Sequence, residues 1–186
     1  MKLHLGSGKR KIPGWINVDI DPANEPDRVD DIFAPFLSTW PAGTVEVIYA
    51  CHVLEHAGRH LYKEVLAYWH GLLKPGGILR LSVPDLGAVF ERHQEGKSKV
   101  SELLGFLYGG QRNEYDYHKM GWDYKSLKAD LLEAGFKDVR RYDRWATEHA
   151  DVDDYSASYL PKLQDCKGME EYRQGQLLSL NVEASK

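Results

Sequence analysis

Lys2-Leu3-His4-Leu5-Gly6-Ser7-Gly8 opens the chain, and Trp15-Ile16-Asn17-Val18-Asp19 follows after a short connection. The first stretch predicts a strand that ends in a glycine turn, and the second predicts a strand that ends in an acid. Glycines permit positive φ angles and let a ligand approach backbone N–H groups, while a carboxylate at the end of the adjacent strand can accept both hydroxyl protons of a ribose. Together they predict a nucleotide-binding corner for a ligand that carries a ribose.

The glycine pattern is only part of a dinucleotide-binding fingerprint. Lys11 stands where the third glycine of that fingerprint is expected, and an isolated G-x-G also occurs in ordinary turns. Taken alone, the pattern leaves both a ligand site and a plain turn open.

Composition and length narrow the class of protein. The 186 residues predict one domain, 1-186, and a net charge of −4 gives no electrostatic reason to bind a nucleic acid. Two cysteines do not make a disulfide framework, which favours a reducing compartment. No signal peptide and no apolar run of about 20 residues is evident. We therefore expect a cytoplasmic protein without a membrane partner.

Strand and helix patterns alternate along the chain. Residues 45–51 and 78–83 predict strands, and apolar residues at helical spacing over 59–73 predict the helix that connects them. Further patterns predict helices over 87–94, 99–108 and 124–134, strands over 136–142 and 176–184, and an irregular segment over 151–175. This alternation predicts a three-layer α/β domain whose ligand crevice lies at the carboxyl ends of the strands.

Five sequence stretches, in this order and spacing, resemble the class I S-adenosylmethionine-dependent methyltransferases, and more closely a short bacterial branch of the type 11 kind. They are Leu5-Gly6-Ser7-Gly8, Gly14-Trp15-Ile16-Asn17-Val18-Asp19-Ile20-Asp21, His52-Val53-Leu54-Glu55-His56, Leu72-Leu73-Lys74-Pro75-Gly76-Gly77 and Leu131-Leu132-Glu133-Ala134-Gly135-Phe136. The resemblance implies a Rossmann-like, seven-stranded, mostly parallel sheet with the last strand antiparallel beside residues 78–83.

The same resemblance implies where the cofactor S-adenosylmethionine binds. The turn of Gly6, Ser7 and Gly8 lies against its methionine part, and Asp19, followed by Ile20, holds the ribose hydroxyls. The remaining contacts implied are Asp31 and Ile32 at the adenine, and Cys51 and His52 near the sulfonium. Asp31 alternatively belongs to a surface turn, and Asp85 is expected to cap the following helix.

One departure from the family pattern concerns the first crossover. Residues 9–13 are too few for the helix that usually joins the first two strands, so we expect this crossover helix to be missing. Lys9 or Arg10 could then anchor the cofactor carboxylate in place of a helix N-terminus. The alternative is a solvated basic turn.

His52-x-x-Glu55-His56 matches the inverted zinc-peptidase pattern literally. That pattern works on a continuous helix, whereas His52 directly follows a predicted strand. We therefore expect no metal, with Glu55 and His56 orienting the pocket wall or capping the next helix.

Aromatic and polar residues gather over 108–123 and predict either a substrate lid or the packing of a long connection. His118 is the candidate general base, because the ordinary pKa of histidine lies close to neutral pH.

These patterns predict methyl transfer to an O, N or C nucleophile of a small molecule or saccharide intermediate, with S-adenosylhomocysteine as the product. The missing helix and the lack of an assured base keep a second hypothesis open, a non-catalytic S-adenosylmethionine-binding or degenerate partner domain. A nucleotide-dependent oxidoreductase is a third, which the imperfect glycine pattern and the match at residues 74–77 disfavour. The sequence does not determine the oligomeric state.

Overall fold

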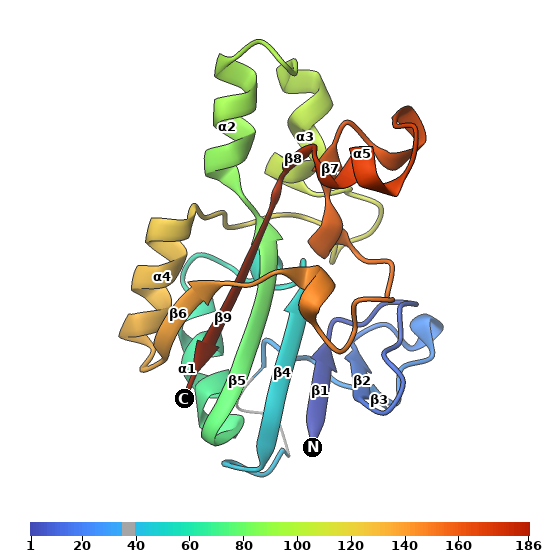
Figure 1. Cartoon of the computed structure of the whole chain (residues 1–186). Helices are drawn as coiled ribbons and strands as arrows, with labels where there is room; N and C mark the ends of the chain where they lie inside the picture. Colours follow the sequence, from blue (N-terminus) through green and yellow to red (C-terminus); the bar gives the residue numbers. More distant parts are fainter. Residues whose placement is uncertain (35–39) are drawn as a thin grey trace.

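The computed structural model describes residues 1–34 and 40–186, and its centre is a seven-stranded sheet in the order β3-β2-β1-β4-β5-β9-β6 (Figure 1). The strands are β1 (Lys2–Leu5), β2 (Ile16–Asp19), β3 (Arg28–Val29), β4 (Val45–Cys51), β5 (Leu73–Pro84), β6 (Lys137–Arg141) and β9 (Ser179–Ser185).

Strand direction confirms the predicted topology. β1 pairs in parallel with β2 and β4, and β4 pairs in parallel with β5. β9 is antiparallel to both β5 and β6, and Leu81 lies opposite Val182. The chain therefore has the Rossmann-like, mostly parallel sheet with an antiparallel last strand that the sequence predicts.

One face of the sheet is covered by helices α1 (Tyr62–Leu72) and α4 (Tyr124–Glu133), as Figure 1 shows. The apolar sides of these helices and alternate residues of the strands form the main core. Its fully buried residues include Leu66 and Trp69 of α1 and Ile48 of β4. Asp123 accepts a hydrogen bond from Ser126 N at 2.7 Å and so caps the start of α4.

The opposite face of the sheet is polar and is covered by irregular chain. Tyr49, Ser82 and Asn181 project from β4, β5 and β9, and segment 142–158 supplies their hydrogen-bond partners. The third layer is thus built from loops and 3₁₀ turns, because buried hydroxyl and amide groups need polar partners that an apolar helix face does not offer.

The first crossover helix is absent, as predicted. Ser7 N donates directly to Val18 O at 3.0 Å, and the connection returns as a loop. The side chain of Asn17 holds this loop, since its Oδ1 accepts from Ile12 N at 2.8 Å. Ile12 and Trp15 then pack against Tyr49. The side chains of Asn17, Ile12 and Trp15 therefore hold the connection between β1 and β2 in place of a helix.

Two strands differ in extent from the sequence prediction. β5 begins at Leu73 and not at residue 78, and it includes residues 74–77 with a register irregularity opposite β4 and a positive φ of 72° at Gly76. The final predicted strand is divided into β8 (Gln176–Leu177) and β9. β8 pairs with β7 (Tyr159–Leu160) instead of the main sheet. Here local tertiary pairing overrides the continuous alternation of the sequence.

Helices α2 (Leu86–Gln94) and α3 (Val100–Tyr108) stand beyond the carboxyl ends of β4 and β5, beside β7, β8 and α5 (Met169–Arg173) (Figure 1). Asp85 caps α2, as expected, by accepting from Ala88 N at 3.3 Å. Within the described residues, no helix has both the length and the apolar character needed to cross a membrane.

Candidate functional site

A cavity of about 650 Å³ lies at the carboxyl ends of β1 and β4. This is where a doubly wound sheet places its ligands, and the volume is that of a small-molecule site. It is lined by six of the predicted site residues, namely Gly6, Ser7, Gly8, Cys51, His52 and His118. The structure therefore brings together residues that lie more than 100 positions apart in the sequence.

The glycine turn packs tightly on one side and is open on the other. Gly6 has a φ of +63°, and a Cβ there would lie 2.3 Å from Cγ2 of Val53, so any other residue would strain the backbone and displace Val53. Gly8 has a φ of +52°, with no atom within 4 Å of the position a Cβ would take. Its bare backbone borders the cavity, which permits close approach of a ligand.

Asp19 lies directly behind this turn and is 8% exposed. Its Oδ2 accepts from Gly8 N at 2.7 Å, and its Oδ1 accepts from Asp21 N at 2.9 Å and from Asn24 Nδ2 at 3.0 Å. A carboxylate offers about four acceptor sites, so about one remains for a ligand. Asp19 thus ties the turn to the end of β2. Neither it nor the partly buried Ile20 is among the residues that line the 650 Å³ cavity.

Asp31 and Ile32 lie apart from that cavity. Both line a separate small cleft, together with Leu3 and Leu5 of β1 and with Trp40. The exposed Asp31 accepts a hydrogen bond from the backbone N of Phe33 at 2.9 Å. The structure does not join this pair to the other predicted site residues.

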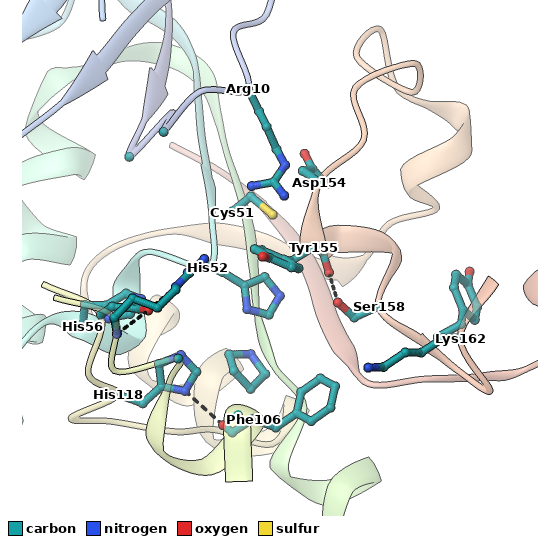
Figure 2. A pocket seen from close by; sticks show the side chains of 18 of the residues that line it. Arg10, Cys51, His52, His56, Phe106, His118, Asp154, Tyr155, Ser158 and Lys162 are labelled. Atoms are coloured by element: carbon teal, nitrogen blue, oxygen red, sulfur yellow. Dashed lines mark hydrogen bonds and ion pairs between the residues drawn. The ribbon is translucent and has the colours of Figure 1, made fainter. Parts of the chain in front are cut away.

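Arg10, and not Lys9, reaches the cavity. The guanidinium carbon of Arg10 lies 4.7 Å from the ring centroid of Tyr155, which belongs to the polar segment 142–158 (Figure 2). This cation–π contact holds a positive charge at the cavity edge.

Cys51 and His52 form the wall at the end of β4. Burial raises the pKa of the Cys51 thiol well above its ordinary value, so the group is a neutral thiol and not a nucleophilic thiolate. His52 has a φ of +53°, and its N donates to Ser82 O at 2.7 Å. This strained backbone turns its imidazole into the cavity.

His118 enters the cavity from the loop after α3. Its Nδ1–H donates to Phe106 O at 3.0 Å, which leaves the lone pair on Nε2, and burial lowers its pKa. Other aromatic residues of the predicted lid differ from His118 in their exposure and packing. Tyr108, Tyr115 and Tyr117 are exposed, while Trp122 is 2% exposed and packs in the main core.

Glu55 was expected only to orient the pocket wall or to cap the next helix, and it lies closer to the predicted site than that. It belongs to the 3₁₀ turn η2 (Leu54–His56), and its side chain is fully buried beneath the cavity. Burial raises the pKa of Glu55, but the approach of His52, His56 and His118 outweighs burial and leaves its pKa below the ordinary value. The literal H-x-x-E-H pattern was the sequence signal for this cluster.

Asp154 and Tyr155 are two further residues of the site that the sequence did not indicate. Asp154 accepts from Tyr49 OH at 2.7 Å and lies 3.4 Å from Nη2 of Arg144. Burial raises the pKa of Asp154, but these partners and Ser156 lower it further, so the group is a carboxylate. Segment 151–175 has no periodic pattern, and only the fold places it over the cavity.

Comparisons with known proteins agree with this geometry at the level of the fold. No protein-family model matches the chain, and no curated protein matches it. Among solved structures, it is similar over its whole length to an S-adenosylmethionine-dependent methyltransferase from Archaeoglobus fulgidus, with 18% identity, 85% of that chain covered and a TM-score of 0.60.

Two further solved structures have the same likeness. An S-adenosylmethionine-dependent methyltransferase from Thermotoga maritima is 11% identical, with all of this chain and 81% of that chain covered and a TM-score of 0.59. The 1,6-didemethyltoxoflavin-N1-methyltransferase from Burkholderia thailandensis, solved with bound S-adenosylhomocysteine, is 16% identical, with coverage of 100% and 70% and a TM-score of 0.54. The chain therefore has the fold of the S-adenosylmethionine-dependent methyltransferases.

Proposed function

We propose that this protein transfers a methyl group from S-adenosylmethionine to an O, N or C nucleophile of a small molecule or saccharide. The observation that carries the proposal is the cavity that the Gly6–Gly8 turn borders at the carboxyl ends of β1 and β4. The similar Burkholderia thailandensis enzyme, a small-molecule methyltransferase with bound S-adenosylhomocysteine, supports the same class of reaction.

The residues present fit this cofactor. The open side of Gly8 would accept the methionine part, and the guanidinium of Arg10 at the cavity edge would bind its carboxylate. Asp19 would use its remaining acceptor site for one ribose hydroxyl, with Ile20 beside it. Cys51 and His52 would face the sulfonium. Asp31 and Ile32 line a separate cleft, so their expected contact with the adenine is not part of this proposal.

When bound, S-adenosylmethionine supplies a methyl carbon that is already activated by its sulfonium sulfur. The main task of the protein is therefore to align donor and acceptor and to exclude water. Phe106 and Tyr155 supply apolar surface to the cavity wall, and Lys162 adds a positive charge at its far side (Figure 2). His118 is the candidate base, and Nε2 is the atom that can accept the acceptor's proton.

Calorimetric titration with S-adenosylmethionine and S-adenosylhomocysteine tests the proposal. We expect micromolar binding, weakened at least about tenfold by Asp19→Ala and unchanged by Glu64→Gln, which removes an exposed carboxylate of α1. Thermal unfolding of each variant separates lost binding from lost folding.

The results also discriminate between the functional classes. Absence of binding to either compound refutes the proposal and favours a degenerate partner domain. Binding of a nicotinamide nucleotide instead favours an oxidoreductase.

A further inference from the structure

Beneath the cavity, Glu55 presents a buried carboxylate that nearby histidines approach. Its side chain has no exposed surface, and neither of its oxygens accepts a hydrogen bond from any residue that the structure describes. His52 Nδ1 lies 3.1 Å from Oε1 without the alignment of a hydrogen bond, and His118 Nε2 lies 3.8 Å from the same oxygen. A buried anion in this situation requires a cation or a proton between itself and its neighbours.

Backbone carbonyls fix the Nδ1–H groups of two of the histidines around Glu55. His118 Nδ1–H donates to Phe106 O, and His56 Nδ1–H donates to Tyr117 O, both at 3.0 Å. A carbonyl oxygen only accepts, so in the neutral form of each ring Nε2 carries the lone pair. This is the arrangement of metal-binding histidines, whose other nitrogen is fixed by a backbone carbonyl.

A chain of hydrogen-bonded side chains determines which nitrogen of His52 carries the proton. Asn181 Nδ2 donates to Ser156 O, which orients its Oδ1 to accept from Ser179 Oγ. Ser179 can then only accept from His52 Nε2 at 3.2 Å. A neutral His52 therefore also directs a lone pair, on Nδ1, at the carboxylate.

The two halves of the cluster are joined through the backbone. Lys119 N and Met120 N donate to the main-chain O of Glu55 at 2.8 Å and 3.1 Å, which fixes the His118 loop against η2. One donor atom each from Glu55, His56 and His118 lie within 4.8 Å of one another. Ligands of a metal at about 2.1 Å are about 3.0–3.4 Å apart, so modest side-chain rotation is enough.

We propose that Glu55, His56 and His118 bind a divalent first-row transition metal ion at the floor of the cavity, with His52 beside it. Two imidazoles and a carboxylate suit Zn²⁺, Fe²⁺, Mn²⁺ or Co²⁺. Three protein ligands leave coordination positions free toward the cavity, which His56 and His118 line. With the metal bound, His118 Nε2 would coordinate it, so the base role proposed for His118 above applies to the metal-free protein.

The literal zinc-peptidase geometry is not what brings these ligands together. His52 ends a strand, and η2 is a short 3₁₀ turn and not a continuous helix. The third ligand comes instead from a loop about 60 residues later in the chain, and no spacing pattern links that loop to the motif.

Direct metal binding to the full-length, tag-free protein tests the proposal without any turnover. After treatment with a chelator, calorimetry with Zn²⁺ and visible absorption with Co²⁺ should each show one equivalent bound. We expect at least about 100-fold weaker binding in His56→Ala and His118→Ala. His60→Ala, which removes an exposed imidazole just before α1, should bind as the wild type does.

A second measurement covers the case in which these variants do not fold. In ¹⁵N spectra of the wild-type imidazoles, Zn²⁺ should shift two or three of the eight histidines. The proposal is overturned by no binding tighter than about 1 mM, by shifts of no histidine, or by variants that keep wild-type affinity. Because S-adenosylmethionine binding is measured separately, failure of the metal site is distinguishable from failure of the proposed methyl transfer.

Discussion

His149 makes stability depend on pH in a way that can be calculated from the structure. Its ring is 2% exposed, lies 4.1 Å from the ring of Tyr49, and has no hydrogen-bond partner for either nitrogen among the described residues. Burial, followed by the nearby charge of Arg80, lowers the pKa of His149 from 6.5 to about 4. The folded state therefore holds this imidazole neutral, between Tyr49 and Trp15.

The sign and size of the effect follow from proton linkage. Because the pKa is lower in the folded than in the unfolded chain, the unfolded state binds the proton more tightly, and stability falls as pH decreases from about 6.5 toward 4. With these two pKa values, the free energy of unfolding should fall by about 2 kcal/mol between pH 7.5 and pH 5 because of His149 alone.

The variant His149→Phe isolates this contribution. Phenylalanine keeps an aromatic ring between Trp15 and Tyr49 and cannot be protonated. Between pH 7.5 and pH 5, the variant should therefore lose about 2 kcal/mol less of its free energy of unfolding than the wild type. Urea unfolding followed by tryptophan fluorescence at pH 7.5 and pH 5 measures both losses. Equal losses in the two proteins would refute the reasoning. Other buried histidines, such as His4, affect both proteins alike and cancel in the difference.

Three further predictions concern the cavity and its cover. Gly6→Ala should destabilise the protein by about 2 kcal/mol or more, measured by urea unfolding, because φ is +63° and the new Cβ would meet Val53. Arg10→Gln should weaken S-adenosylmethionine binding about tenfold in calorimetry, whereas Lys9→Gln, outside the cavity lining, should leave it unchanged; equal effects would remove Arg10 as the anchor. Asp154→Ala should cost about 3–5 kcal/mol of stability, because it leaves a buried guanidinium and a buried hydroxyl without their shared partner, and a loss below about 1 kcal/mol would contradict this.

Local sequence patterns determined most of the sheet and a part of the cavity wall. The turn at Gly6 and Gly8 and the place of Asp19 at the end of β2 were predictable, because positive φ and an acid at a strand end are properties of short segments. The missing first crossover helix was predictable from length alone, since no helix fits between Gly8 and Gly14. The antiparallel last strand came from the family resemblance, and the structure confirms it.

Tertiary structure alone decided which polar side chains meet. His118 reaches Glu55 only because the loop after α3 hydrogen-bonds to η2, and Asp154 reaches Tyr49 across 105 positions because an irregular segment covers a polar sheet face. Neither the loop after α3 nor the segment around Asp154 has a periodic pattern of apolar residues in its sequence. The periodicity of apolar residues shows which face of a strand or helix is buried. The partners of a buried charge depend instead on how whole elements pack together. This packing is set by contacts between residues far apart in the chain.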